Sequence, residues 1–192
     1  MKYLDGSFFS RHTRIVAFEL IGHELVFETL GGLLTGKIVE TEAYFGANDP
    51  ASHAYRGVTP RNRVMFGPAG KTYVYFTYGN HYCLNIVTEK EGVAGAVLIR
   101  ALEPLGGIDM MRKNRRQINV NHMTNGPGKL TQAFGISREH SGMDLNTGSS
   151  LRIVESPSLE PVQIEVTPRI GISRAKKKLL RFCLKDNAFV SR

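Results

Sequence analysis

Cysteine is scarce in this chain, and its scarcity argues against a disulfide framework and against a metal site built from cysteines. The 192 residues include only two cysteines, Cys83 and Cys183, each among apolar neighbours. One possible pair makes no disulfide framework, so we expect two buried free thiols in a reducing compartment. Neither the cysteines nor the six histidines show metal-ligand spacing, and the zinc deaminase pattern of His-x-Glu followed by Pro-Cys-x-x-Cys is missing. We therefore expect no metal and no cofactor.

Long apolar runs are also missing, together with the segments that direct a chain to a membrane. No hydrophobic stretch approaches the length that crosses a bilayer, and Asp5 and Gly6 interrupt any signal-peptide core at once. The chain has no internal repeat, low-complexity tract or Pro/Ser-rich linker. The sequence therefore predicts one compact domain over residues 1–192, in the cytoplasm and without a membrane partner.

Positive charge is what the chain has in excess. Lysine and arginine number 25 against 17 aspartates and glutamates, which gives a formal net charge of +8. The basic residues gather in two clusters, Arg112–Arg116 and Arg174–Arg181. Binding to phosphates releases counterions, so these clusters favour a polyanionic partner such as nucleic acid. The alternative is a solvated basic face that only keeps the protein in solution.

Two hairpins dominate the predicted secondary structure. Each has two β-prone arms around a glycine turn: Glu24–Thr29 and Leu33–Tyr44 flank Gly31-Gly32, and Lys71–Tyr78 and His81–Thr88 flank Gly79-Asn80. Further strands are expected over Ala94–Leu102, Leu151–Glu155, Val162–Val166 and Leu179–Leu184. Because hairpins outnumber βαβ units, we expect an α+β fold: a curved, largely antiparallel β-sheet with a protruding β-hairpin and flanking helices.

Helices and one long loop complete this prediction. The first helix is expected from a cap at Ser10 to Ile21, with Ile15, Phe18 and Ile21 on one stripe and Gly22 as the stop. Two more helices are expected over Gly107–Arg116 and Lys129–Phe134. The polar, turn-rich stretch Asp49–Pro68 is predicted to be an ordered loop.

A strand with two carboxylates is the first candidate for chemistry. In the run Ile38–Tyr44, the strand period of two places Glu40 and Glu42 on one face together with the tyrosine. A solvated sheet face would explain this pattern. However, the loop that follows carries His53, Tyr55 and Arg56 and could close over a pocket, which favours a functional site.

Tyrosines crowd the second hairpin. Tyr73 and Tyr75 share a strand face, and Tyr78 lies beside the turn. Ordinary cross-strand packing accounts for Tyr73. An aromatic residue at a hairpin tip of a basic protein can instead wedge between base steps and hold the gap left by an extruded nucleotide. The nearby Gly70-Lys71-Thr72 is no phosphate loop, because it leads into a strand and not into a helix.

Several segments, in order along the chain, carry a resemblance to a known family. They are Gly36–Tyr44, Thr59–Arg63, Tyr73–Gly79, Cys83–Ile86, Leu98–Pro104, Gly126–Leu130 and Pro168–Gly171. The chain resembles the alkyladenine (3-methyladenine) DNA glycosylases of the mammalian type, which also occur in bacteria. The resemblance begins near the start of the chain and runs almost to Arg192, and so many separated matches make it highly specific. It implies a monofunctional enzyme of base excision repair that flips damaged purines out of DNA and hydrolyses their N-glycosidic bond.

The resemblance also implies a role for each candidate residue. Glu42 would position and deprotonate the attacking water, Arg100 and the carbonyl of Ile170 would help to hold it, and Glu40 would have no such role. Tyr44, His53 and Tyr75 would line the base pocket, Tyr78 would intercalate, and Asn85 would clash with the amino group of normal guanine. Residues 187–191 depart modestly from the family ending, and no role is assigned there.

The implied partner is double-stranded DNA that contains alkylated or deaminated purines. The candidate substrates are 3-methyladenine and 7-methylguanine, with hypoxanthine and etheno-adenine as further ones. The family attacks with water, and ideal alternation points Lys37 to the opposite strand face from Glu42, so no lyase activity is expected. A monomer is expected, in a bacterial cytoplasm and associated with the nucleoid through DNA.

Two other functions stay open at this point. A non-catalytic nucleic-acid-binding module would explain the charge and the tyrosines, but it gives Glu42 no role. A carbohydrate glycosidase could use Glu40 and Glu42 as its carboxylate pair, roughly 6.5 Å apart at the backbone. Such enzymes usually take their acid and base from opposite sides of the scissile bond, and strong positive charge suits a neutral sugar polymer poorly.

Overall fold

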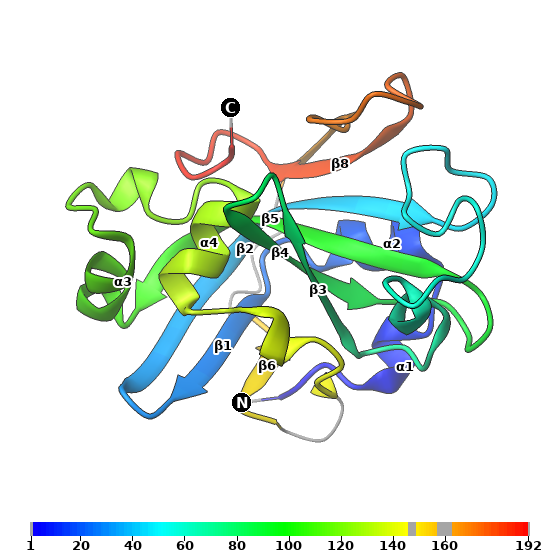
Figure 1. Cartoon of the computed structure of the whole chain (residues 1–192). Helices are drawn as coiled ribbons and strands as arrows, with labels where there is room; N and C mark the ends of the chain where they lie inside the picture. Colours follow the sequence, from blue (N-terminus) through cyan, green and yellow to red (C-terminus); the bar gives the residue numbers. More distant parts are fainter. Residues whose placement is uncertain (1, 146–148, 157–162, 192) are drawn as a thin grey trace.

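A long antiparallel sheet organises the chain. The computed structural model describes residues 2–145, 149–156 and 163–191 (Figure 1). The strands are β1 (Glu24–Thr29), β2 (Gly32–Phe45), β3 (Thr72–Thr77), β4 (His81–Val87), β5 (Gly95–Gly106), β6 (Leu151–Val154), β7 (Ile164–Pro168) and β8 (Leu179–Leu184). They form one sheet in the order β3-β4-β5-β2-β1-β6, with β8 added to β2 and β7 to β8. All of these pairings are antiparallel, which confirms the predicted fold class.

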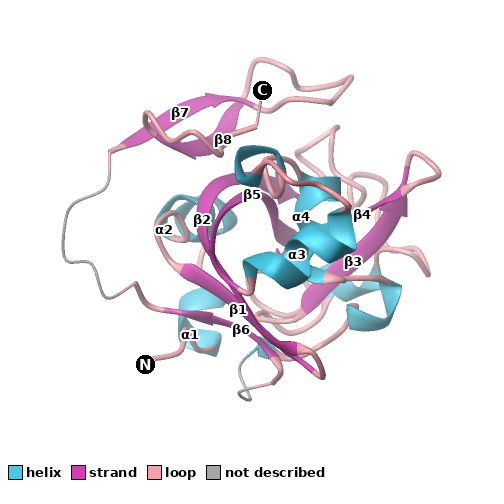
Figure 2. Cartoon of the chain, turned by 90° about the vertical axis from the view of Figure 1, so that its left-hand side faces the viewer, coloured by secondary structure: helices cyan, strands magenta, loops and turns pink. Residues whose placement is uncertain are grey.

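Strand β2 changes partners along its length. Its first half pairs with β1, residues 40–42 pair with β8, and β5 follows it along the other edge. The register with β5 shifts on both sides of Glu40, and such irregularities bend a strand and increase its twist. The sheet is accordingly strongly curled in the view of Figure 2. Glu40 and Glu42 therefore lie where three strands meet.

Helices cover the curled sheet and share one apolar core with it. They are α1 (Gly6–Phe9), α2 (Thr13–Glu19), α3 (Ile108–Arg115) and α4 (Pro127–Phe134). Helix α2 packs on β2, α4 packs on β4 and β5, and α3 packs on α4. The core joins Val16 of α2, Ile38 of β2 and Phe134 of α4, all fully or almost fully buried. The predicted helices near residues 107–116 and 129–134 are confirmed.

The predicted first helix is wrong in its start and in its buried face. Asp5 caps α1 by accepting from the N–H groups of Ser7 and Phe8, and Ser10 ends α1 instead of opening a helix. Helix α2 begins at Thr13, whose N–H donates to the Glu89 carboxylate at 2.7 Å. A cap supplied from so far along the chain leaves no local signal.

Of the predicted stripe Ile15, Phe18 and Ile21, only Ile21, which follows α2, is buried, at 4% exposure. Ile15 and Phe18 are 46% and 43% exposed, whereas Val16, Ala17 and Leu20 are fully buried. Helix α2 starts later and is shorter than expected. It packs on β2, and this contact determines which of its residues form the buried face.

Both predicted hairpins are present. The β3–β4 hairpin projects from the body of the molecule (Figure 2). Its turn is centred one residue earlier than expected: Tyr78 and Gly79 have φ of 51° and 72°, and the Asn80 N–H donates to the Thr77 carbonyl at 3.3 Å. A non-glycine residue at positive φ is uncommon. The side chain of Tyr78 lies at the tip of the hairpin and is 81% exposed.

The loop between β2 and β3 is ordered, as predicted. Asn62, 1% exposed, donates from Nδ2 to the carbonyls of His53 and Gly57, and its Oδ1 accepts from the Thr59 N–H. These bonds satisfy backbone groups that no strand could reach. The loop is thereby held against the sheet with His53 in a defined place.

The remaining predicted strands and the two cysteines agree with the structure where it describes them. Strands β5, β6 and β8 are found as expected, and the strand predicted over Val162–Val166 is found as β7 from Ile164, with Val162 outside the described residues. Cys83 and Cys183 are buried free thiols, and burial raises the pKa of Cys183 to about 11. No helix in the described part of the chain is long and apolar enough to span a membrane.

The hydroxyl of Thr41 links β2 to α2, and its removal tests how strongly the helix supports the strand. Its Oγ1 donates to the Ala17 carbonyl at 2.7 Å, and both residues are fully buried. Thr41→Val keeps the shape but leaves that carbonyl unpaired, so we expect the free energy of unfolding to fall by about 1–3 kcal/mol. Urea unfolding would show a lower midpoint at an unchanged m-value.

The half-buried Thr77 at the end of β3 offers the matched control. Thr77→Val changes the same atoms at a partly exposed position, where effects stay within about 0.5 kcal/mol. Equal unfolding midpoints for the two variants would contradict the role given to Thr41.

Candidate functional site

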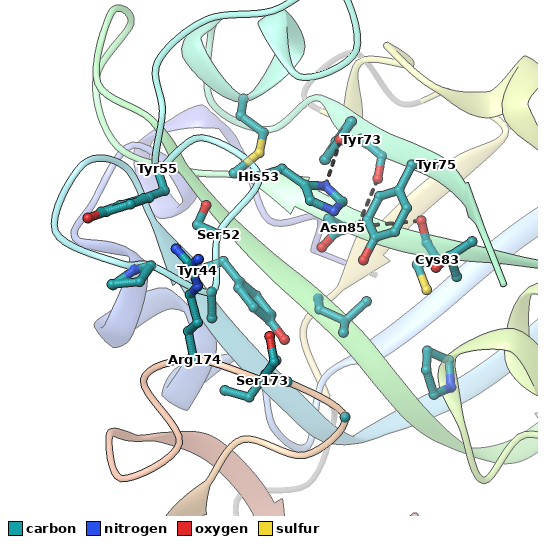
Figure 3. Close-up of a pocket in the computed structure, with 18 of the residues that line it drawn as sticks. Tyr44, Ser52, His53, Tyr55, Tyr73, Tyr75, Cys83, Asn85, Ser173 and Arg174 are labelled. Atoms are coloured by element: carbon teal, nitrogen blue, oxygen red, sulfur yellow. Dashed lines mark hydrogen bonds between the residues drawn. The ribbon is translucent and has the colours of Figure 1, made fainter.

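A pocket of about 590 Å³ opens between the loop after β2, the β3–β4 hairpin and the segment after β7 (Figure 3). Most of the site residues predicted from the sequence line it: Tyr44, His53, Tyr75, Tyr78, Asn85, Arg100 and Ile170. Glu42 is fully buried and, like Glu40, lies outside the described lining, but it contacts three of these lining residues. The fold therefore brings together all eight residues, which are spread over residues 42–170.

The Glu42 carboxylate is held in place by groups from three parts of the chain. Its Oε2 accepts from the Tyr44 hydroxyl at 2.7 Å and from Nη1 of Arg100 at 3.3 Å. Its Oε1 accepts from the Ile170 N–H at 2.9 Å. The sequence-based expectation concerned the carbonyl of Ile170, and the contact found with Glu42 is made by the N–H of that residue.

Burial makes Glu42 more basic than an exposed carboxylate. It raises the pKa of Glu42, while the charge of Arg100 and the bond from Ile170 oppose the rise. Burial and the neighbouring carboxylate also raise the pKa of Tyr44, so its hydroxyl stays protonated and donates to Glu42. A buried carboxylate with raised proton affinity is suited to accept a proton at neutral pH.

Arg100 lies between the two carboxylates of β2. Its Nε donates to Glu40 Oε1 at 3.0 Å while Nη1 reaches Glu42. The two glutamates therefore share a strand face, as predicted, although the register shifts around Glu40. Without Arg100, two fully buried carboxylates would face each other, which costs free energy unless a cation compensates them.

Glu40 is engaged on all sides and lies outside the described lining of the pocket. Besides Arg100, it accepts from Nε of Arg181 at 2.6 Å and from the N–H and Oγ of Ser191 at 2.8 and 2.9 Å. A carboxylate whose oxygens are occupied in this way is no partner acid for Glu42. This arrangement argues against the carbohydrate glycosidase alternative.

Ser191 belongs to this network although no role was assigned to residues 187–191 from the sequence. Its Oγ donates to Glu40 and accepts from Nη2 of Arg100 at 3.4 Å. A serine near the end of a chain has no pattern that would single it out. Only the tertiary contact reveals its place beneath the pocket.

Aromatic rings form the walls of the pocket. The His53 and Tyr75 rings are in edge-to-face contact with centroids 4.5 Å apart, and His53 Nδ1 lies 3.0 Å from the Tyr73 hydroxyl. Figure 3 shows the Tyr44 ring set apart from this cluster. Burial, with a smaller effect of Arg61, lowers the pKa of His53, so that its imidazole is neutral at physiological pH.

Asn85 lies on the β4 side of the pocket. It is 3% exposed, and its Nδ2 donates to the carbonyls of Tyr73 and Cys83 at 3.1 and 3.4 Å. These two bonds fix the plane of the amide. Tyr78 projects from the hairpin tip at the opening of the same pocket.

A buried ion pair behind Tyr44 is the part of the site that the sequence analysis missed. Nη1 and Nη2 of Arg169 each lie 2.6 Å from an oxygen of Asp49, and both side chains are fully buried. The Arg169 guanidinium also lies over the Tyr44 ring, 4.5 Å from its centroid. Arg169 stood in the recognised segment Pro168–Gly171, and Asp49 stood at the start of the predicted loop, but nothing local links them.

The arrangement is suited to act on a flat, electron-poor ring. Aromatic faces attract such a ring or a cation. The basic carboxylate of Glu42 lies directly behind lining residues, to which it is hydrogen-bonded, and a carboxylate at such a place is suited to take a proton from water and to stabilise positive charge. Within the described residues, no group of three or more His, Cys, Asp or Glu is placed to hold a metal ion.

Comparison with known proteins gives a consistent result. The family model for methylpurine-DNA glycosylase matches residues 7–188. A protein of Carboxydothermus hydrogenoformans is 51% identical over 189 residues, 98% of each chain. A protein of Prosthecochloris aestuarii is 50% identical over 186 residues, which are 96% of this chain and 89% of that protein. A protein of Chlorobaculum tepidum is 45% identical over 193 residues, which are 100% of this chain and 92% of that protein. All three carry the provisional name 3-methyladenine DNA glycosylase.

Removing the hydroxyl of Ser191 tests the network around Glu40. Ser191→Ala deletes a hydrogen bond to a buried carboxylate, so we expect the free energy of unfolding to fall by about 1.5–3 kcal/mol. The measurement is chemical denaturation followed by circular dichroism. Ser7→Ala is the matched control, because its hydroxyl also donates to a carboxylate, that of Asp5, but at an exposed position. Equal, small decreases in the free energy of unfolding for both variants would show that the buried contact of Ser191 does not stabilise the fold.

Proposed function

The chain belongs to the methylpurine-DNA glycosylase family, and on that premise we propose that it is a monofunctional DNA glycosylase of base excision repair. It flips damaged purines out of duplex DNA and hydrolyses their N-glycosidic bond with a water molecule activated by Glu42. Its substrates are 3-methyladenine and 7-methylguanine, together with hypoxanthine and etheno-adenine. It acts as a monomer on nucleoid DNA.

One observation carries this proposal: the fully buried Glu42 carboxylate adjoins an aromatic pocket and is oriented by Arg100, Ile170 and Tyr44. Three oriented contacts fix the position of the carboxylate before substrate arrives, which is what catalysis by positioning requires. A non-catalytic binding module would give no reason to bury a carboxylate in this way, because its burial costs free energy.

The proposed reaction proceeds at the sugar carbon that carries the base. The bond between that carbon and the purine nitrogen breaks, and its electron pair leaves with the base. Glu42 stabilises the oxocarbenium-like transition state and accepts a proton as water attacks. The products are an abasic site and the free base, which is neutral when the alkylated purine was cationic; a neutral purine such as hypoxanthine must in addition take up a proton from solvent as it leaves. Arg100 helps to hold the water, and the Ile170 carbonyl is a further candidate for this contact.

The walls of the pocket favour a positively charged base. An alkylated purine bears a positive charge, which weakens its bond to the sugar and attracts it to aromatic faces. Tyr44 on one side and His53 with Tyr75 on the other would sandwich the base. Since the lowered pKa keeps His53 neutral, its imidazole adds no charge that would repel a cation, and the cation beside this wall is Arg61, 5.5 Å from the centroid of the Tyr75 ring. Asn85 would exclude normal guanine by a clash with its amino group.

Tyr78 is the proposed wedge in the DNA stack. Its exposure at the tip of a projecting hairpin fits a side chain that fills the space left by a flipped nucleotide. The basic cluster Arg174–Arg181 begins at the rim of the same pocket, with Arg174 among the lining residues. Contacts of such residues with phosphates would hold the duplex in register.

Water is the proposed nucleophile, and the surroundings of Glu42 support this choice over a lysine. None of the described residues that line the pocket is a lysine. Lys37 lies 3.7 Å from Glu103 in an ion pair, as a residue pointing away from Glu42 would. We therefore expect no cleavage of the abasic strand.

Release of free base from methylated duplex DNA tests the proposal. We expect the wild-type protein to release 3-methyladenine and leave the strand uncut. Glu42→Gln should bind the same DNA but release base at least about 10²-fold more slowly, since it has lost its general base. Glu91→Gln, in an exposed loop, is the control and should release base at the wild-type rate. If the wild-type protein releases no base from methylated or deaminated DNA, the binding-module alternative takes the place of this proposal.

The pH dependence of base release provides a second test. Glu42 acts in its ionised form, so activity should be complete above its pKa and lost below it. Because burial raises that pKa, the acid limb for release of 7-methylguanine should have its midpoint above 4.5, the ordinary glutamate value. Single-turnover rates would be measured, with DNA binding by Glu42→Gln at each pH as the control for lost affinity. A midpoint at or below the ordinary value would contradict the assigned base.

A further inference from the structure

We propose that Asp49 and Arg169 form a positioning pair that fixes Tyr44 in the pocket wall and keeps the back of that wall electrically neutral. The aromatic faces and Glu42 are thereby left to decide between cationic and neutral bases. This inference deepens the proposed function and rests on it. Neither residue lines the pocket among the residues described, so both act through Tyr44 and the segments they join.

The contact between the two residues is rigid. The two terminal nitrogens of the Arg169 guanidinium, Nη1 and Nη2, bond to Asp49 at 2.6 Å each, and Nη1 also donates to the Ala43 carbonyl at 2.9 Å. Two parallel bonds fix the plane of the guanidinium as well as its position. Burial opposes ionisation of Asp49, but the bonds and charge of Arg169 outweigh it and lower its pKa. The pair is therefore ionised and fixed at neutral pH.

The pair joins the parts of the chain that carry the site. Asp49 accepts from the Phe45 N–H at 3.2 Å, at the end of β2, and from the Ala51 N–H at 3.4 Å, at the start of the loop that carries His53. Arg169 directly precedes Ile170, whose N–H donates to Glu42. Without the pair, the end of β2, the loop that carries His53 and the segment that contains Ile170 would no longer be held to one another.

The position of Arg169 gives the pair its second effect. Its guanidinium covers one face of Tyr44 at 4.5 Å from the ring centroid, and the ring also borders the pocket. A cationic base stacked on Tyr44 would thus have a second cation behind the ring, and the two would repel each other. Asp49 cancels this charge, because its oxygens lie within hydrogen-bonding distance of the same guanidinium.

This charge balance predicts opposite effects for the two neutralising substitutions. Asp49→Asn leaves a cation behind Tyr44, so the ratio of 7-methylguanine release to hypoxanthine release should fall about three- to tenfold. Arg169→Gln leaves an anion there, so the same ratio should rise by about as much. Both variants should release either base about tenfold or more slowly, because the walls are no longer held in place. In the double variant the ratio should return to the wild-type value while the rates stay low.

The experiment measures single-turnover release of both bases by the wild type and the three variants. Affinity for DNA with an abasic site is measured in parallel, because that ligand has no base for Tyr44 to hold and its binding should be unchanged. Thr124→Val is the control for stability alone: it removes a buried bond from Oγ1 to the Leu102 carbonyl, outside the described lining of the pocket. That variant should leave the ratio unchanged.

Opposite shifts of the ratio support the proposal. An unchanged ratio, or shifts in the same direction, overturns the charge balance, and unchanged rates overturn the positioning. If a single variant does not fold, Arg169→Lys replaces it: the charge remains but the bidentate contact is lost, so both rates should fall at a constant ratio, and wild-type rates would overturn the positioning. If the wild type releases neither base, the proposed function itself fails. If the wild type releases both bases and the variants release them with the wild-type ratio and rates, only this inference fails.

Discussion

The site depends on one arginine placed between two buried carboxylates. Glu40 and Glu42 share a face of β2, and neither is exposed to solvent, so their charges would destabilise the fold if nothing compensated them. Arg100 bonds to both, and Arg181 and Ser191 complete the coordination of Glu40. Glu40 can therefore be viewed as the anchor of Arg100. Glu42 keeps only contacts that orient it, and its raised pKa follows from the same burial.

A second buried ion pair, Asp49 with Arg169, lies against the ring of Tyr44. Asp49 and Arg169 are fully buried, as Glu40 is, and they too connect segments that are distant in sequence. In both cases the arginine reaches a proposed site residue of β2: Arg100 reaches Glu42, and Arg169 covers the ring of Tyr44. Beneath Tyr44 and Glu42 the charges are thus paired, while Arg56 and Arg174 add positive charge to the lining of the pocket. Such pairing fixes the geometry of Tyr44 and Glu42, and the buried charges of Asp49, Arg169 and Glu40 are themselves compensated.

The sequence predicted the sheet and its hairpins because strand alternation and glycine turns are local signals. It also predicted that Glu40 and Glu42 share a face, since this follows from the period of two. The start of α2 could not be predicted, because Glu89 supplies its cap from elsewhere in the chain. Asp49, Arg169 and Ser191 were missed for the same reason: each acts through a partner more than a hundred residues away. The resemblance of motifs, and not the residue pattern alone, assigned roles to His53, Asn85 and Ile170.

The three-way junction on β2 also has a consequence for how the molecule folds. The residues that pair with β2 extend from Glu24 to Cys183, so this strand gains its full set of neighbours only after long stretches of chain have closed into loops. Contacts of such high sequence separation form slowly and late. Until β8 arrives, Glu40 lacks Arg181, and the junction holds an incompletely paired charge. Completion of the sheet and completion of the pocket are thus one cooperative event, which disfavours partially folded forms with a finished pocket.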